Sequence, residues 1–333
     1  MKNSNEFCTF EKKEILNSIE ICAGAGGQAL GLEQAGFKHI ALVEIDKPAC
    51  ETLRYNRPSW NVIRADIRSF SGTAYHNSGV DLLAGGVPCP PFSDAGFQLG
   101  QHDERDLFFE ALRLVKEINP KAVMLENVRG LFNRKFKPYR EEIKNCLRQN
   151  GYQTDWRLVN SSDFGVPQLR PRTILIAMKP EYFKHYEWPL KKVTPKTVGE
   201  VLYGDMASQG WLYAEQWKQL ADGIAPTLVG GSKKHGGADL GPTRAKKQWL
   251  SLHVDGKGVA DSPPVNGFVG MPRLTVKMAA KIQGFPDDWI ITGKKTPAYR
   301  QIGNAFPPPV AEAIGKKIKQ AILNGKSKEG SKG

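Results

Sequence analysis

The stretch from residue 18 to residue 36 constrains the fold more than any other part of this chain. Ser18 to Cys22 predicts a short β-strand that runs directly into the turn Ala23-Gly24-Ala25-Gly26-Gly27. Gln28 to Ala35 then follows a helical pattern, which Gly36 ends. A strand, a glycine-rich turn and a helix are typical of nucleotide-binding domains, because glycine lets a ligand approach the backbone at the helix N-terminus. One such turn is a weak signal by itself.

The segments that follow continue this alternation of strands and helices. His39 to Val43 predicts a second strand ending at Glu44, and Val62 and Ile63 lead to Asp66. An acidic residue after the second strand is placed to accept hydrogen bonds from ribose hydroxyls. Asp66 is placed to accept one from an exocyclic amine such as that of adenine. Each carboxylate alone is more often a solvated surface group, but their order after the glycine-rich turn favours a nucleotide site.

Cys89 lies in a second loop of interest. Val80 to Ala84 predicts a strand buried in a parallel sheet, and the loop after it contains Pro88, Pro90 and Pro91. Ligands and chemistry gather where the strands of an open α/β sheet end. A thiol held there by prolines is a candidate nucleophile. The alternative is a buried free cysteine that acts as a small hydrophobic residue, and this loop alone leaves the two interpretations even.

Charged side chains follow the later strands as well. Ala122 to Leu125 predicts a strand that ends at Glu126, so we expect Glu126 at the same sheet edge as Cys89. Its alternative roles are a helix cap or a salt-bridge partner. Gln168, Arg170 and Arg172 alternate in an extended segment, which places them on one side, as suits a phosphate or a base carbonyl. Surface salt bridges are the alternative for the two arginines.

Between Tyr182 and Met271 the α/β pattern stops. This segment is rich in tryptophan, glycine and proline and predicts a small, irregular, largely non-helical domain. Helical patterns return after Arg273 and again from Val310 to Leu323. We therefore expect a discontinuous large domain of residues 15–181 and 273–324, a small domain of residues 182–272 and a disordered basic tail of residues 325–333. Ser93 to Arg105 is expected to be a mobile lid.

Composition limits the class of protein. Lys and Arg number 47 against 34 Asp and Glu, and the resulting charge of +13 favours a polyanionic partner. The five cysteines form no C-x-x-C pair and the six histidines lack metal-ligand spacing, so we expect neither a disulfide framework nor a metal site. No apolar run approaches the ~18 residues of a membrane span. These features favour a cytoplasmic protein.

In this order the motifs resemble those of the DNA cytosine-5 methyltransferases of bacterial modification systems, from Ser18 to about Leu323. The matching landmarks are Ala-Gly-Ala-Gly-Gly, Glu44, Asp66, the Pro-Cys loop, Glu-Asn-Val, Gln-x-Arg-x-Arg, Arg-Leu-Thr…Gln-Gly-Phe-Pro and Gln-x-Gly-Asn. Each is weak alone, and together they are specific. The resemblance implies an α/β fold, with a Rossmann-like S-adenosylmethionine-dependent methyltransferase domain and a smaller target-recognition domain.

Three positions depart from the family pattern. Cys22 stands where an aromatic residue usually precedes the glycine-rich turn, and Ile45 stands where an aromatic residue often follows Glu44. Pro90 replaces a common glutamine after the nucleophile and removes a backbone donor. The first two departures are expected to change packing against the cofactor.

The resemblance also assigns roles to residues. Cys89 would add to carbon 6 of cytosine, Glu126 would act on ring nitrogen 3, and Arg170 and Arg172 would hold the target nucleotide and order the catalytic loop. The residues expected to bind S-adenosyl-L-methionine are Cys22, Ala23, Gly24, Gly26, Gly27, Glu44, Ile45, Asp66, Ile67, Pro88, Leu107, Asn304 and Ala305.

The implied substrate is double-stranded DNA, from which the target cytosine is flipped while the 182–272 domain reads base edges in the major groove. Pairing with a restriction endonuclease and a monomeric state are expected. Three alternatives stay open: a tRNA cytosine-5 methyltransferase, a catalytically silent DNA-binding relative and a nucleotide-dependent oxidoreductase.

Overall fold

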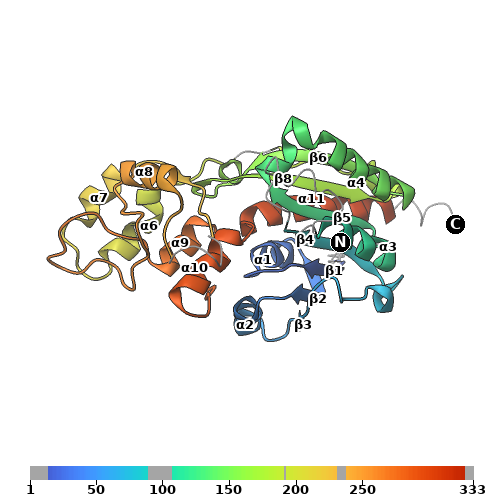
Figure 1. Cartoon of the computed structure of the whole chain (residues 1–333), viewed down its shortest axis with the longest axis horizontal. Helices are drawn as coiled ribbons and strands as arrows, with labels where there is room; N and C mark the ends of the chain where they lie inside the picture. Colours follow the sequence, from blue (N-terminus) through green and yellow to red (C-terminus); the bar gives the residue numbers. More distant parts are fainter. Residues whose placement is uncertain (1–13, 89–106, 191–192, 231–237, 327–333) are drawn as a thin grey trace, which may run out of the picture.

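A computed structural model describes residues 14–88, 107–190, 193–230 and 238–326 of the chain. Its centre is a seven-stranded sheet in the order β3-β2-β1-β4-β5-β8-β6, shown in Figure 1. The strands are β1 (Leu16–Ile21), β2 (Phe37–Glu44), β3 (Val62–Arg64), β4 (Val80–Gly86), β5 (Ala122–Val128), β6 (Gln153–Asn160) and β8 (Pro171–Met178). The first five are parallel, and β8 runs antiparallel to both of its neighbours. The expected α/β fold is confirmed.

Helices cover both faces of this sheet because its strands are apolar on both sides. In β4, Leu82 packs against α1 (Gly27–Gln34) and α11 (Pro308–Lys326), whereas Leu83 packs against α3 (Phe108–Ile118) and α4 (Lys137–Gln149). Successive side chains of a strand point to opposite faces, and buried parallel strands are therefore nearly continuous apolar runs. The remaining helices of the larger lobe are α2 (Lys47–Asn56) and α5 (Pro180–Phe183), with 3₁₀ turns at Thr73–Tyr75, Arg129–Phe132, Arg134–Phe136 and Ser161–Asp163.

A smaller lobe lies beside the end of the sheet that bears the carboxyl ends of its parallel strands (Figure 1). It contains α6 (Val198–Ala207), α7 (Ala214–Leu220) and α8 (Thr243–Ser251). A short strand, β9 (Ala225–Pro226), pairs with β7 (Gln168–Leu169) of the larger lobe. Loops make up much of the described part of this lobe, as expected of a largely non-helical domain, and its helices are short. The buried Trp217 and Trp249 lie on the inner faces of α7 and α8, and the sequence analysis did not recognise these two short helices.

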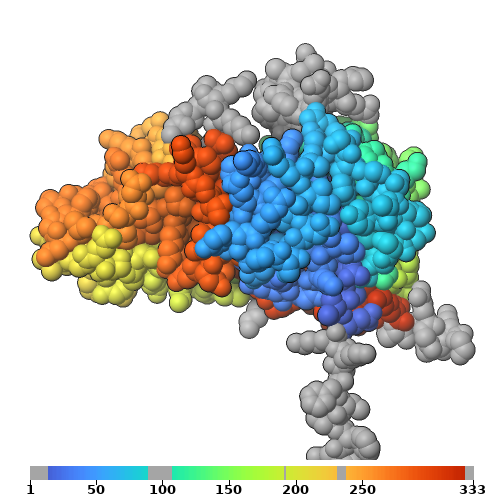
Figure 2. All heavy atoms as spheres, turned by 90° about the horizontal axis from the view of Figure 1, so that it is seen from below, coloured from blue at the N-terminus to red at the C-terminus, as the bar shows by residue number. Residues whose placement is uncertain are grey.

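The core of the smaller lobe also includes the chain that follows residue 272. Helices α9 (Val276–Ile282) and α10 (Lys295–Asn304) share one hydrophobic cluster with α6 and α7, and Ala25 and Leu30 of the glycine-rich turn and α1 join it. Figure 2 shows the orange residues of this region directly against the blue N-terminal residues. Helix α10 had no counterpart in the sequence-based prediction. Helix α11 continues to Lys326, two residues into the expected tail. No described helix is long and apolar enough to cross a membrane.

Candidate active site

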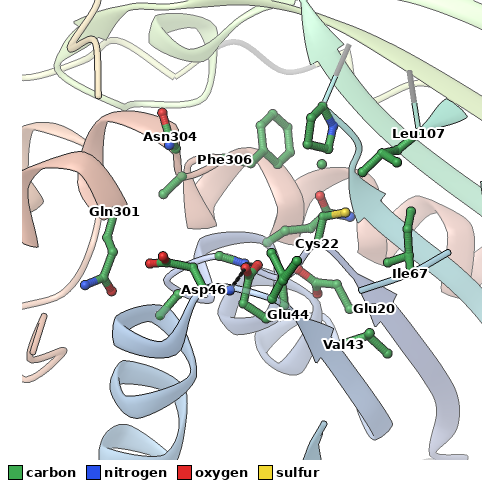
Figure 3. A pocket seen from close by; sticks show the side chains of 18 of the residues that line it. Glu20, Cys22, Val43, Glu44, Asp46, Ile67, Leu107, Gln301, Asn304 and Phe306 are labelled. Atoms are coloured by element: carbon green, nitrogen blue, oxygen red, sulfur yellow. Dashed lines mark hydrogen bonds between the residues drawn. The ribbon is translucent and has the colours of Figure 1, made fainter. Parts of the chain in front are cut away.

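A cavity of about 430 Å³ opens where β1, β2 and β4 end (Figure 3). That volume lies within the usual range for small-molecule sites. All but two of the residues expected to bind the cofactor line this cavity. They are Cys22, Ala23, Gly24, Glu44, Ile45, Asp66, Ile67, Pro88, Leu107, Asn304 and Ala305.

The two exceptions, Gly26 and Gly27, serve packing. Gly26 precedes α1 with a φ of 82°, and a Cβ there would lie 2.6 Å from the side chain of Leu53. A Cβ on Gly27 would lie 2.2 Å from the carbonyl oxygen of Phe306. No side chain fits at that distance. Gly26 therefore allows close packing against α2, and Gly27 lets α1 begin directly against the loop that follows α10; neither lines the cavity.

Glu44 closes one side of the cavity and fixes the glycine-rich turn. Its Oε2 accepts a hydrogen bond of 2.7 Å from the backbone N–H of Gly24, and its Oε1 accepts one of 2.7 Å from the backbone N–H of Asp46. Burial raises the pKa of the Glu44 carboxyl, while these backbone donors oppose the rise. The carboxylate is thus held in one orientation with lone pairs left for ligand hydroxyls.

Asp66 faces the same cavity but is engaged by a neighbour. Arg68 donates from Nε to both carboxylate oxygens at 3.1 and 3.0 Å, and Arg68 also lines the cavity. This side-chain hydrogen bond holds the pKa of Asp66 below its ordinary value. A ligand amine at Asp66 would have to share the carboxylate with Arg68.

Two polar residues at the floor of the cavity were missed in the sequence. Glu20 is 1% exposed and accepts a hydrogen bond from the backbone N–H of Ala29, but its Oε2 has no partner among the described residues. Gln28 is 3% exposed, and neither polar atom of its amide has such a partner. Buried polar groups are nearly always paired, so these atoms indicate a polar ligand. A charged residue near the end of an apolar strand was the available signal for Glu20.

Cys22 contributes a thiol to the wall at the position of the first family departure (Figure 3). Its φ of 52° is unusual for a residue other than glycine and bends the chain from β1 into the turn. Burial, with Glu44 and Asp66 nearby, raises the pKa of this thiol, so it stays protonated and is no nucleophile at neutral pH.

A second cavity of about 500 Å³ adjoins the first, and both are lined by Gly86, Pro88, Glu126 and Asn304. Gly86 and Glu126 lie side by side in the β4–β5 pair. Glu126 is 9% exposed and pairs with Arg172, whose Nε lies 2.8 Å from its Oε1. Burial raises the pKa of the Glu126 carboxyl against the opposing effect of Arg172 and Arg170. The pair thus presents a carboxyl group with an increased tendency to hold a proton at the junction of the two cavities.

Gln168 and Arg170, which were expected to lie on the same side as Arg172, are held by hydrogen bonds within the protein. Arg170 is 1% exposed and donates to the carbonyls of Leu228, Gly303 and Ala305 at 2.8, 2.7 and 3.0 Å. Gln168 is fully buried and donates to Gln283 at 2.8 Å. Alternation placed these side chains on one side as expected, and that side packs against protein, although Arg170 also lines the second cavity. The structure therefore shows Arg170 joining three segments and Arg172 alone reaching Glu126.

Cys89 and the expected lid, Ser93 to Arg105, lie outside the described residues. The flanking residues do belong to the structure, and the backbone N–H of Leu107 donates to the carbonyl of Pro88 at 3.5 Å. Pro88, to which Cys89 is bonded, lines both cavities. Within the described ranges, no group of three or more His, Cys, Asp or Glu side chains is placed to hold a metal ion.

Comparison with known proteins bears on what this site does. A family model described as C-5 cytosine-specific DNA methylase matches residues 16–320. The chain is 55% identical over 309 residues to the Type II methyltransferase M.NgoMIV of Neisseria gonorrhoeae, covering 92% of this chain and 97% of that protein. It is 56% identical over 311 residues to the Type II methyltransferase M.NaeI of Lentzea aerocolonigenes, covering 92% and 75%. A solved structure of a putative DNA modification methyltransferase encoded within an E. coli prophage superposes with a TM-score of 0.66 at 25% identity, covering 92% and 99%.

Proposed function

Given that this chain belongs to the C-5 cytosine-specific DNA methylases and is a DNA cytosine-5 methyltransferase that uses S-adenosylmethionine, we propose how its own residues perform the reaction. The observation that carries the proposal is the shared wall of the two cavities, formed by Gly86, Pro88, Glu126 and Asn304. We assign the 430 Å³ cavity to the cofactor and the 500 Å³ cavity to the target base. Their junction is where a methyl group would pass from one to the other.

The residues of the first cavity fit the cofactor. S-adenosylmethionine supplies the methyl group, and its ribose, adenine and methionine parts need acceptors and donors that this cavity has. Glu44 would bind the ribose hydroxyls and Asp66 the adenine amine. The unpaired polar atoms of Glu20 and Gln28 suit the polar groups of the methionine part.

In the second cavity Cys89 would add to carbon 6 of the cytosine as a thiolate, forming a carbon–sulfur bond. Electron density then moves toward ring nitrogen 3, where the Glu126 carboxyl donates a hydrogen bond or proton. Carbon 5 thereby becomes nucleophilic enough to take a methyl group. A water molecule would then accept the carbon 5 proton, and the electron pair of that C–H bond re-forms the ring double bond as the carbon–sulfur bond breaks and releases the Cys89 thiolate. Arg172 would hold Glu126 in position through their 2.8 Å contact.

These atoms of cytosine cannot be reached inside a duplex, so the base must be flipped out at a cost of a few kcal/mol. We propose double-stranded DNA as the substrate and assign sequence recognition to residues 182–272. The net charge of +13 supports binding to the phosphate backbone. Grafting this segment into a relative of known specificity is expected to transfer the methylated sequence, and retention of the host's own sequence would place recognition elsewhere.

The names of the relatives support a place in a restriction-modification system. We propose a monomeric cytoplasmic enzyme paired with an endonuclease that cuts the same sequence when it is unmethylated. Among the earlier alternatives, membership of a DNA methylase family argues against an oxidoreductase and against a tRNA-specific enzyme. Retention of the paired Glu126 and Arg172 argues against a silent relative.

The proposal is tested with duplex DNA that contains 5-fluorocytosine, whose carbon 5 cannot release a proton. Incubation with S-adenosylmethionine is expected to leave a protein–DNA adduct that resists denaturation. Cys89→Ala is expected to abolish the adduct, and Cys146→Ala, which changes a half-buried thiol on α4, is expected to keep it. An undiminished adduct in Cys89→Ala would remove Cys89 from the mechanism. Methylation of tRNA in preference to plasmid DNA would overturn the substrate assignment.

A further inference from the structure

A third cavity, of about 690 Å³, continues from the target-base cavity toward the smaller lobe, and both are lined by Thr227 and Val229. One of its walls comes from the larger lobe and includes Arg129 and Asn160. The opposite wall is helix α8, from which Arg244 and Gln248 line the cavity. A duplex whose cytosine occupies the target-base cavity would present its neighbouring base pairs here.

Helix α8 is firmly anchored by its other face. Trp249 is fully buried and belongs to the core of the smaller lobe. Lys246 donates to Asp239 at 2.7 Å. These contacts fix the direction in which the exposed face of α8 points. That face is therefore preorganised for recognition without ordering on binding.

Two of the three α8 residues that line the cavity, Arg244 and Gln248, are four positions apart, so they lie on one face of the helix. Both are exposed. Within the described ranges no hydrogen bond or ion pair engages the side chain of Arg244 or Gln248, in contrast to Lys246, which lies between them in the sequence and pairs with Asp239. A long charged side chain that lines a cavity and has no acidic partner among the described residues is available for a ligand.

Resting on the proposed DNA substrate, the geometry points to α8 as the helix that reads base edges, and we propose Arg244 and Gln248 as specificity-determining residues. The major groove, about 12 Å wide, admits an α-helix. The Arg244 guanidinium would donate two hydrogen bonds to O6 and N7 of a guanine beside the target cytosine. The Gln248 amide would bind the edge of an adjacent base. Arg129, on the opposite wall, would contact a phosphate and position the duplex.

The test compares Arg244→Ala, Gln248→Ala and a control, Lys247→Ala, which removes an exposed charge of α8 outside the cavity lining. Each full-length variant methylates a pool of duplexes of random sequence, and bisulfite sequencing gives the preference at every position around the methylated cytosine. Arg244→Ala is expected to lose preference at one position, with kcat/KM on the wild-type sequence about 5- to 150-fold lower. Lys247→Ala is expected to weaken binding about equally on all sequences.

A second variant separates recognition of the base from the electrostatic attraction of Arg244 to DNA. Arg244→Lys keeps the positive charge but loses the planar fork, so it is expected to relax the same position while the salt dependence of binding stays close to wild type. It also serves if Arg244→Ala does not fold. Unchanged base preference in both Arg244 variants, or a loss equal at all sequences, would overturn the proposal. Failure of the wild-type protein to methylate duplex DNA would instead overturn the proposed substrate.

Discussion

Replacing Glu126 with glutamine tests whether the carboxyl acts in catalysis or only pairs with Arg172. The change removes an acid from a pair that is 12% exposed on each side. The amide oxygen of glutamine still accepts from Arg172, so only the contribution of the negative charge to that hydrogen bond is lost, which is at most about 1.5–3 kcal/mol of stability. A protein stable by about 5–15 kcal/mol stays almost entirely folded after that loss. Destabilisation alone therefore cannot lower the rate substantially.

A catalytic role predicts a much larger effect on the rate. General acid–base groups contribute about 10²–10⁴-fold, so single-turnover methylation by Glu126→Gln is expected to fall by that factor. Because burial raises the pKa of Glu126, the protonated form persists to higher pH than in an exposed glutamate. The wild-type rate is expected to decline as pH rises through that pKa, and this decline is expected to be absent in the variant.

Asp81→Asn is the matched control, because Asp81 is also a buried carboxylate of the sheet paired with a cation. It lies 2.5 Å from Lys121, near the start of β4 and thus at the opposite end of the strand from Gly86. This variant is expected to melt at a lower temperature and to turn over at the wild-type rate. A Glu126→Gln protein with the same behaviour as Asp81→Asn would refute the catalytic role.

Three further expectations concern the first cavity. Arg68→Ala is expected to free Asp66 and tighten S-adenosylmethionine about 2- to 10-fold by calorimetry, and weaker binding would mean that Arg68 itself holds the cofactor. Gly27→Ala is expected to prevent or severely weaken folding, since a Cβ there meets the carbonyl of Phe306. Its control is Gly204→Ala on α6, where a Cβ meets open space, and thermal melts are expected to show a stabilisation of up to about 1 kcal/mol. The pKa of Glu20 is raised by burial, so its contribution to stability is present at low pH and lost as pH rises. In the absence of cofactor, the melting temperature of Glu20→Gln relative to wild type is thus expected to be higher at neutral pH than at acid pH. A difference in melting temperature that does not change with pH would contradict this.

The sequence predicted the parts of the molecule that follow from local pattern. Strands β1, β2, β4 and β5 contain short apolar segments followed by a turn or by polar residues, and the ends of parallel strands must meet at one sheet edge. For that reason Cys22, Glu44, Asp66 and Pro88 lie around one cavity as expected. The family motif added Asn304, which no local pattern connects with them.

Other features depended on contacts between distant segments. Alternation correctly placed Gln168 and Arg170 on one side, but only the folded chain shows that this side faces Leu228, Gly303 and Ala305. Gly26 and Gly27 were assigned to the ligand, although neighbouring side chains and carbonyls leave no space for a Cβ. Helix α10 contains Pro297 and Gly303, which weaken a helical pattern, and its stability comes from burial in the core of the smaller lobe.

Arg170 also sets a condition on how this protein is made. Two of its carbonyl partners belong to residues 303 and 305, and the bond to Gly303 spans 133 positions. At a synthesis rate of about 5–20 residues per second, Gly303 emerges from the ribosome roughly 7 to 27 seconds after Arg170. During that interval the guanidinium lacks these partners, and burying an unpaired charge is costly. The Arg170 side chain is therefore expected to stay in solvent on the nascent chain and to be buried only when nearly all of the protein has been synthesised.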